Sequence, residues 1–235
     1  MFQFIGCGSA FNPNLGNTSC FIRRSNALLL VDCGGTVFHQ IIKLNLLNDI
    51  KQLQVVITHT HPDHVGSLGD LVFYCHFKLQ IKPILFFPRP ELLRNLLNCL
   101  GVEPFMYELQ NGLEAILTAE AFKGATIRFI PVTHVDTIPT FGFLLELEGK
   151  RCYYSGDGNQ INGEILEELA QGRLDQVYQD TCGADYEGNP HLSLRRLAEI
   201  IPHSLRNKVH CIHSDRQFNR EEAIMLGFNV VESGF

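Results

Sequence analysis

The sequence shows no membrane-spanning segment and no paired-cysteine motif, and from its first residues we expect no secretory leader. No apolar run approaches the roughly 18 residues that a membrane-spanning helix needs. The chain begins with Met-Phe-Gln-Phe-Ile, without the basic and apolar stretches of a signal peptide. Its eight cysteines are scattered, and no two of them form a Cys-x-x-Cys motif. We therefore expect free thiols, a cytoplasmic location and no contact with a membrane.

The sequence also has no excess of positive charge and no recognisable linker. Its 235 residues carry 19 Lys and Arg against 25 Asp and Glu, which gives a net charge of −6. A large surface for nucleic acid of any sequence needs clustered basic residues, so the acidic balance argues against it, although a local basic patch stays open. With 45% apolar residues and no break in composition, the chain predicts a single globular domain over residues 1–235.

The sequence does contain a histidine-rich segment, Thr58-His59-Thr60-His61-Pro62-Asp63-His64, directly after an apolar, β-branched run. Such a run indicates a buried strand that enters a loop and then a helix. The loop supplies imidazoles and a carboxylate, which are both ligands for zinc, and carboxylate also suits harder cations. Because the residues alternate, His59 and His61 can point one way while Asp63 and His64 point another. That arrangement fits two adjacent metal ions better than one.

Further candidate ligands stand at the ends of other predicted strands. His134, Asp157 and His213 each follow such a segment, and the apolar run before His213 favours it over the nearby His210. Asp32 ends another strand and is either an acceptor that orients a metal-bound histidine or a turn or helix-capping residue. Strands are predicted at 2–5, 20–22, 27–32, 55–57, 81–87, 125–132, 141–147, 151–154, 176–179, 208–212 and 229–232, and helices at 36–47, 68–79, 91–100, 165–170, 192–201 and 220–226.

The motif His59-x-His61-x-Asp63-His64 resembles the signature of the metallo-β-lactamase fold, and the resemblance extends from the first strand to His213. It implies an α/β fold in which two mixed β-sheets are sandwiched between helices (αββα). It also implies two divalent metal ions, with zinc as the default and manganese compatible. No cysteine replaces a ligand, unlike in lactamase-type relatives. The resemblance assigns one ion to His59, His61 and His134, a second to Asp63, His64 and His213, and a bridging position to Asp157.

Asp180 and His191 indicate a subfamily. Asp180 follows a predicted strand, and His191 precedes a predicted helix, as do an acid and a histidine in the tRNase Z-like branch that the chain resembles. The resemblance implies that His191 protonates the leaving oxygen, while Asp180 fixes its tautomer and raises its pKa. tRNase Z usually has Glu in place of Asp180, so the shorter side chain puts the contact in question. The alternative is a solvent-facing histidine near a helix N-cap. Asp63 is predicted to serve in catalysis as well as in metal binding.

The sequence lacks the Gly- and Lys-rich arm with which long-form and bacterial tRNase Z grip tRNA. Only Glu148-Gly149-Lys150 joins the two predicted strands where the arm should fall. In size and motifs the chain resembles the short anti-Pycsar enzymes of phages and bacteria, which degrade cyclic nucleotide signals. We therefore predict a dinuclear metal-dependent phosphodiesterase for small phosphodiesters, foremost 3′,5′-cyclic nucleotides. A metal-bridging hydroxide would attack phosphorus while the cations neutralise the developing charge.

Three alternatives stay open at this point. A tRNA 3′-end endonuclease would be favoured by a basic patch and by cleavage of tRNA. A lactone or thioester hydrolase on the same metals should not need His191. A metal-binding scaffold without catalysis is disfavoured by the complete ligand set. Members of the resembled branch are often homodimers, so we expect a homodimer. Phe11 and Phe141 are candidates for stacking against a base.

Overall fold

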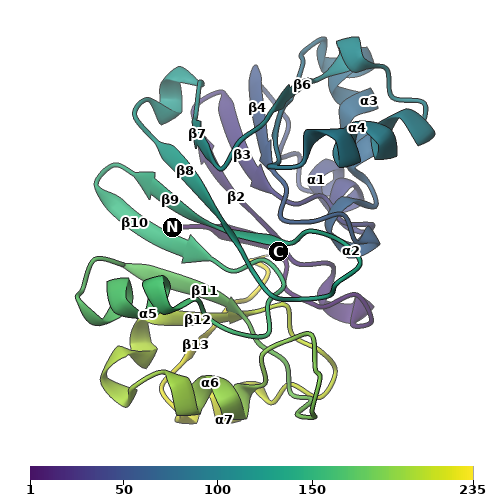
Figure 1. Cartoon of the computed structure of the whole chain (residues 1–235). Helices are drawn as coiled ribbons and strands as arrows, with labels where there is room; N and C mark the ends of the chain where they lie inside the picture. Colours follow the sequence, from purple (N-terminus) through teal and green to yellow (C-terminus); the bar gives the residue numbers. More distant parts are fainter. Residues whose placement is uncertain (235) are drawn as a thin grey trace.

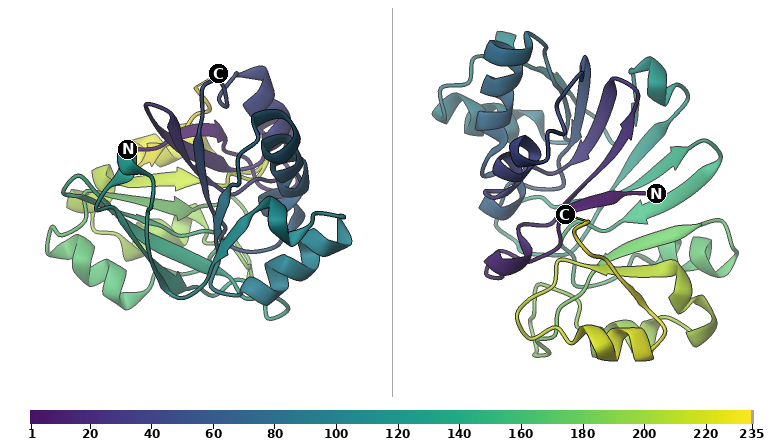
Figure 2. Two further views of the ribbon diagram at one scale, coloured as in Figure 1. Left: turned by 90° about the horizontal axis from the view of Figure 1, so that it is seen from above. Right: turned by 180° about the vertical axis from the view of Figure 1, so that it is seen from behind.

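Two β-sheets packed face to face form the centre of the molecule, and helices cover the outer face of each sheet (Figure 1). The structure is a computed structural model that describes residues 1–234, so Phe235, the last residue of the domain predicted over 1–235, lies outside the described residues. The views in Figure 2 show the same layers, with the helices of the first half of the chain on one side and the green and yellow helices on the other. The predicted αββα architecture is confirmed.

The first sheet comes from the N-terminal half of the chain, in the order β1-β2-β3-β4-β5-β6. Pairing is antiparallel from β1 to β3 and parallel from β3 to β6. All five residues of β3 are buried, as expected for a central strand covered on both faces. The strands are β1 (Gln3–Gly6), β2 (Ser19–Arg24), β3 (Ala27–Val31), β4 (Gln52–Val56), β5 (Ile84–Phe86) and β6 (Glu108–Gln110).

The second sheet has the order β13-β12-β11-β10-β9-β8-β7, antiparallel from β7 to β10 and parallel from β10 to β13. The predicted hairpin is present: β9 and β10 are joined by Glu148 and Gly149, both with positive φ (53° and 73°), as in the tight turns that match strand twist. The strands are β7 (Glu114–Ile116), β8 (Thr126–Pro131), β9 (Phe141–Leu147), β10 (Lys150–Tyr154), β11 (Gln176–Asp180), β12 (Val209–Ile212) and β13 (Asn229–Val230).

The helices bury their apolar sides against the sheets. α1 (Val37–Lys43), α3 (Leu68–Tyr74) and α4 (Pro90–Cys99) cover the first sheet, and α5 (Gly163–Ala170), α6 (Leu194–Ile200) and α7 (Arg220–Met225) cover the second. The short α2 (Pro62–Val65) belongs to the histidine-rich segment. Between the sheets, Phe143 stacks on Tyr154 with ring centroids 5.3 Å apart. Within residues 1–234, no helix is long and apolar enough to cross a lipid bilayer.

Two details of the predicted secondary structure need correction. The helix predicted over 68–79 is regular only to Tyr74, and Cys75–Leu79 form a wider π-helical turn that ends at Gln80, in a left-handed conformation with φ 57°. Strands β6 and β7 were not predicted. Each has three residues and lies at a sheet edge, where partial exposure leaves almost no alternation to detect.

Glycines allow three backbone segments to meet where the histidine-rich segment lies. A Cβ on Gly34 would lie only 1.9 Å from the carbonyl oxygen of Asp63. Gly156 has φ 59°, and a Cβ there would lie 2.6 Å from the carbonyl oxygen of Phe141. Only residues without a side chain permit such approaches. The loops after β3 and β10 are therefore packed closely around the predicted metal site.

Candidate metal centre

The predicted metal ligands converge at one end of the sheets. Within residues 1–234, their donor atoms form two groups, apart from a third that combines Asp157 and His213 with Asp180 and His191, and in each group all atoms lie within 4.8 Å of one another. Asp157 belongs to both groups, as the resemblance implied. His210 instead stacks on Tyr178, with ring centroids 4.9 Å apart, and belongs to neither. The first group is His59, His61, His134 and Asp157, and the second is Asp63, His64, Asp157 and His213.

The first group needs a positive charge between its nitrogens. His59 Nε2 lies 3.1 Å from His61 Nδ1, and His134 Nε2 lies 3.3 Å from the same atom. Burial lowers the pKa of His59 and of His61, which favours neutral rings. Neutral imidazoles that direct ring nitrogens at one point cannot all be satisfied by each other's protons, whereas a divalent cation accepts every lone pair. The geometry therefore fits a metal ion here.

The second group leaves buried polar atoms without hydrogen bonds. His64 Nε2 and Asp157 Oδ1 lie 3.2 Å apart, yet neither makes a hydrogen bond within the described part of the chain. His213 Nε2 lies 3.2 Å from Asp63 Oδ2 and 3.5 Å from Asp157 Oδ2. A buried polar atom without a partner costs about 1–3 kcal/mol. A second cation among these atoms would remove that cost, so the residues fit two divalent metal ions. The individual ligand roles stay a prediction.

Acceptors outside the two groups orient the histidine rings. Asp32 Oδ2 accepts a hydrogen bond from His64 Nδ1 at 2.9 Å, and Asp32 also accepts from the backbone N–H and the hydroxyl of Thr58, both at 2.8 Å. The carbonyl oxygen of Pro190 accepts from His134 Nδ1 at 3.1 Å. Such partners fix the tautomer and the ring orientation of metal-binding histidines. Of the two roles considered for Asp32, the structure therefore supports the orienting one.

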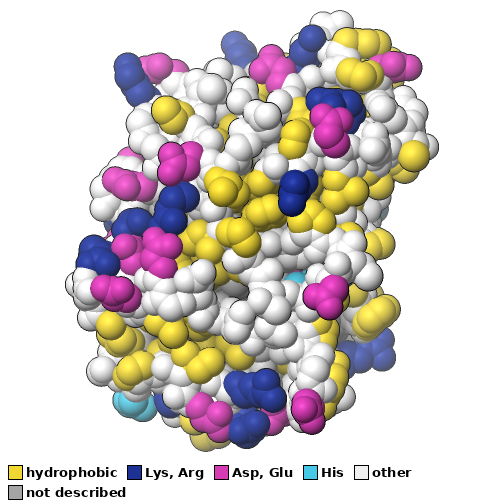
Figure 3. Space-filling model, viewed as in Figure 1, with side chains coloured by type: hydrophobic (Ala, Val, Ile, Leu, Met, Phe, Trp, Pro, Cys, Tyr) yellow, Lys and Arg dark blue, Asp and Glu magenta, His cyan; other side chains and the backbone are white. Residues whose placement is uncertain are grey.

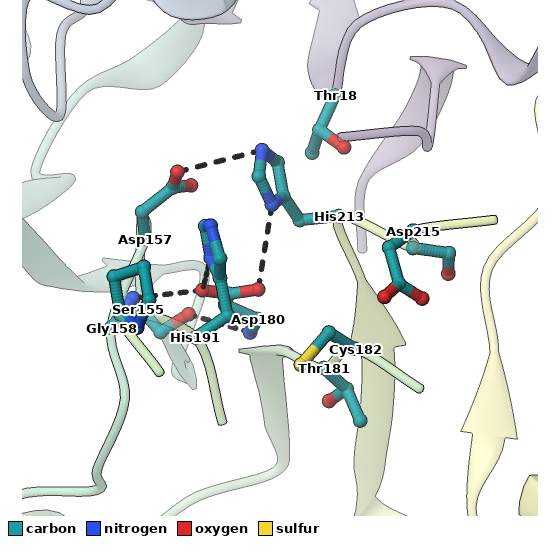
Figure 4. Close-up of polar contacts among 12 residues, drawn as sticks. Thr18, Ser155, Asp157, Gly158, Asp180, Thr181, Cys182, His191, His213 and Asp215 are labelled. Carbon is teal, nitrogen blue, oxygen red and sulfur yellow. Dashed lines mark hydrogen bonds and ion pairs between the residues drawn. The ribbon is translucent and has the colours of Figure 1, made fainter. Parts of the chain in front are cut away.

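His191 and Asp180 meet beside the second group (Figure 4). His191 Nδ1 lies 2.7 Å from Asp180 Oδ2, so the aspartate reaches the ring despite its short side chain. The other carboxylate oxygen faces His213 Nδ1 at 3.4 Å. Burial alone would lower the pKa of His191, but the buried carboxylate of Asp180 outweighs it and the pKa is raised. This contact leaves Nε2 of His191 free to donate a proton.

A cavity of about 530 Å³ opens above these groups. Phe11, which is 86% exposed, and Tyr186, which is 56% exposed, line it together with Arg216. Phe141 is 6% exposed and packs against Phe87, with ring centroids 5.9 Å apart, so the prediction that it stacks on a base is wrong. Sequence reasoning missed Tyr186 and Arg216, because both lie on loops without a motif. The floor is formed by His61, Asp63, His134, Asp157, His191 and His213.

The metal-free protein should lose stability as the pH rises. Burial alone would lower the pKa of His213, but Asp157 and Asp180 outweigh it and raise the pKa to about 10, from an ordinary value of 6.5. A group whose pKa is raised by folding stabilises the folded state fully below its unfolded pKa, and this stabilisation is lost as the pH rises through the folded pKa. The Tm of the metal-free protein should therefore fall between pH 6.5 and about 10.

The metal-loaded protein provides the comparison, because a bound ion replaces the proton on His213. Its Tm, measured by scanning calorimetry over the same range, should not show this fall. The variant His213→Asn, measured without metal, should have a shallower slope than the metal-free parent. Equal slopes for the loaded and metal-free proteins would contradict the expectation.

Comparison with known proteins identifies the family. The family model described as "Anti-Pycsar protein Apyc1" matches residues 1–232. The chain is 29% identical over 221 residues to the anti-Pycsar protein Apyc1 of Paenibacillus harenae, which covers 90% of this chain and 88% of that protein. It is 28% identical over 186 residues to the ribonuclease Z of Mycobacterium avium (strain 104), which covers 72% of this chain and 65% of that protein.

The fold has a close counterpart among solved structures. The metallo-β-lactamase fold protein YhfI from Bacillus subtilis superimposes with a TM-score of 0.76, over 100% of this chain and 97% of that chain, at 17% identity. At this identity the likeness concerns the fold alone, and the family follows from the match over nearly the whole chain. The chain therefore belongs to the family of the anti-Pycsar protein Apyc1, within the metal-dependent phosphodiesterases of the metallo-β-lactamase fold.

Proposed function

We propose that this phosphodiesterase hydrolyses 3′,5′-cyclic nucleotides. The observation that carries the proposal is the close pair of His191 and Asp180, 2.7 Å apart, at the floor of a cavity with two metal-binding groups. The cavity volume, about 530 Å³, lies in the range typical for small ligands and suits one nucleotide. The names of the related anti-Pycsar proteins agree with a nucleotide signal as substrate.

Each part of the site has its own role in the proposed hydrolysis of the phosphodiester. Two divalent ions held by the two groups would supply an activated water and neutralise charge on the phosphoryl oxygens. His191 gives its Nε2 proton to the ribose oxygen as the bond from that oxygen to phosphorus breaks. Asp180 holds the ring and raises the pKa of His191, which favours the protonated form. Asp63, which lines the cavity, would orient the attacking water as a hydrogen-bond acceptor.

Phe11 is the residue that we expect to stack on the base. Base stacking on an aromatic ring contributes about 1–3 kcal/mol, so Phe11→Ala should raise KM for cyclic nucleotides roughly 5- to 150-fold. The value of kcat should change little, because Phe11 lies at the rim, away from the reacting atoms. Steady-state kinetics test this. The control is Phe77→Ala, a phenylalanine that is 64% exposed outside the cavity. Equal KM values for the two variants would exclude stacking on Phe11.

Several further properties belong to the same proposal. Zinc is the proposed metal, because imidazole nitrogens are three of the four donors of the first group and two of the four of the second, and manganese is compatible with the same donors. A cytoplasmic location agrees with eight unpaired cysteines, seven of them buried. A single domain agrees with the apolar core that both sheets share. We also propose a homodimer, which light scattering can test.

The similarity to a ribonuclease Z favours a second candidate, a tRNA 3′-end endonuclease. Two features weigh against it. The β9–β10 connection is a two-residue turn, with no room for a tRNA-binding arm. On the face shown in Figure 3, Lys and Arg side chains are intermingled with Asp and Glu.

A lactone or thioester hydrolase would not need the contact between His191 and Asp180, and a scaffold without catalysis would not need the complete ligand set.

The deciding experiment offers metal-loaded protein 3′,5′-cyclic AMP, 3′,5′-cyclic GMP and a 3′-extended tRNA precursor side by side. We expect opening of the cyclic nucleotides and an intact tRNA. Chelator-treated protein is the control and should act on neither. Cleavage of the tRNA without opening of the cyclic nucleotides would overturn the proposal in favour of the endonuclease.

A further inference from the structure

The 182–191 loop carries His191 from the end of β11 to the start of α6, and one buried amide holds this loop together. Asn189 is 6% exposed. Its Nδ2 donates to the carbonyl oxygen of Ala184 at 2.8 Å and to Cys182 Sγ at 3.3 Å. Its Oδ1 accepts from the backbone N–H of His191 at 3.0 Å. A single side chain therefore joins the start of the loop to the residue that bears the imidazole.

The end of the same loop is fastened to the segments that deliver metal ligands. The carbonyl oxygen of Asn189 accepts from Asn159 Nδ2 at 3.2 Å. The next carbonyl, that of Pro190, accepts from His134 Nδ1 at 3.1 Å. The backbone N–H of Gly158 donates to Asp180 Oδ2 at 3.0 Å (Figure 4). The loop, the partner of His191 and the first metal group thus form one hydrogen-bonded unit.

Asn189 has no polar side-chain atom left for a substrate. It reaches the cavity wall, but Oδ1 and Nδ2 are both used inside the loop. Pro190 has no N–H, so His191 supplies the first backbone N–H after that of Asn189. The side-chain oxygen of Asn189 accepts from this N–H and so fixes the backbone of His191. The ring of His191 can keep its 2.7 Å contact with Asp180 only while this backbone stays in place.

We propose that Asn189 is a positioning residue that holds His191 in line with the leaving oxygen. The inference rests on the proposed function, in which His191 acts as the general acid. The attacking water loses a proton to solvent and its oxygen forms a new bond to phosphorus, the bond to the ribose oxygen breaks, and the Nε2 proton of His191 moves to that oxygen. His191 then regains a proton from solvent. A misplacement of about 1 Å can cost roughly 10²-fold in rate. Loss of the Asn189 side chain should therefore impair proton donation and little else.

The test compares leaving groups. Asn189→Ala should lower kcat for cyclic nucleotides roughly 10²-fold. Hydrolysis of bis(p-nitrophenyl) phosphate should change by less than about threefold, since p-nitrophenolate leaves without a proton, and two metal equivalents should remain bound. Asn189→Asp keeps an oxygen that can accept from His191 N–H, so it should recover part of the lost rate.

The matched control is Gln54→Ala. Gln54 is a buried amide on β4 of the first sheet, 1% exposed, and its Nε2 donates to Thr118 Oγ1 at 2.9 Å. This variant should lower Tm, and any change in kcat should be the same for cyclic nucleotides and for bis(p-nitrophenyl) phosphate. If Asn189→Ala slows both substrates equally, or changes neither, the positioning role is overturned.

A second measurement separates this inference from the proposed function. If the parent protein opens no cyclic nucleotide, the proposed function fails, yet the position of His191 can still be read by proton NMR. The Nδ1–H that is hydrogen-bonded to Asp180 should give a low-field signal, assigned by its absence in His191→Ala. The signal should be lost in Asn189→Ala and retained in Asn189→Asp and Gln54→Ala. Its persistence in Asn189→Ala would overturn the inference.

Discussion

Replacing Asp157 by Ala should abolish turnover and reduce the bound metal below two equivalents per chain. Asp157 Oδ1 lies 3.2 Å from His64 Nε2, and Oδ2 lies 3.7 Å from His59 Nε2. The same Oδ2 lies 3.5 Å from the Nε2 atom of His213. No other residue belongs to both ligand groups, among residues 1–234. Without the negative charge of Asp157, only the carboxylate of Asp63 within these groups opposes the positive charge of two adjacent cations. We therefore expect the variant to lose at least one of the two metal ions.

Metal content by mass spectrometry and turnover of cyclic nucleotides check this expectation together. Asp157→Asn, which keeps the shape but removes the charge, should also lose metal and activity. Asp70→Ala removes an exposed carboxylate on α3 and serves as the matched control, with both metals and full activity expected. An Asp157→Ala variant that keeps two metals and full activity would refute the assignment of the site.

The clustering of the candidate ligands was predictable because most of its information is local. The histidine-rich segment places four candidate donors within six residues, and the others stand at the ends of apolar runs. Strand ends that lie far apart in sequence meet at one edge once the sheets form, so the pattern predicts the cluster without any distances. The contact between Asp180 and His191 could not be predicted in this way, because it depends on how the 182–191 loop is folded.

Other features depend on tertiary packing that no local pattern reveals. Phe141 occupies the first position of β9 near the site, and only the packing of Phe87 against it shows that it faces the core. Asp32 and His213 both have φ of 58°, a conformation that L-residues rarely adopt. Nothing in their sequence neighbourhoods predicts it. Such strained conformations persist where the surrounding structure holds the backbone in place. Here the strained backbone directs the side chains of Asp32 and His213 toward the predicted metal ligands.

Replacing His191 by Ala should slow the opening of cyclic nucleotides by roughly 10²–10⁴-fold, the usual contribution of a general acid, while both metals stay bound. His191 lies in a further group of donor atoms with Asp157, Asp180 and His213, but it belongs to neither of the two groups of predicted metal ligands, so its removal leaves every predicted ligand in place. His39→Ala, an exposed histidine on α1, is the matched control and should change neither rate nor metal content. An unchanged rate in His191→Ala would reduce the residue to a structural role.

The pH dependence of kcat separates a general acid from a residue that merely shapes the cavity. Because Asp180 raises the pKa of His191 against the effect of burial, the protonated ring persists above pH 6.5, and kcat should fall only when the pH exceeds the raised value. Asp180→Asn removes the charge that raises this pKa, so the alkaline fall in kcat should move to lower pH. His191→Ala should lack that limb altogether, because the proton donor is gone. If the alkaline fall in kcat stays at the same pH in both variants, it reports the titration of another group. His191 is then not the general acid, and the proton donor is another residue of the cavity.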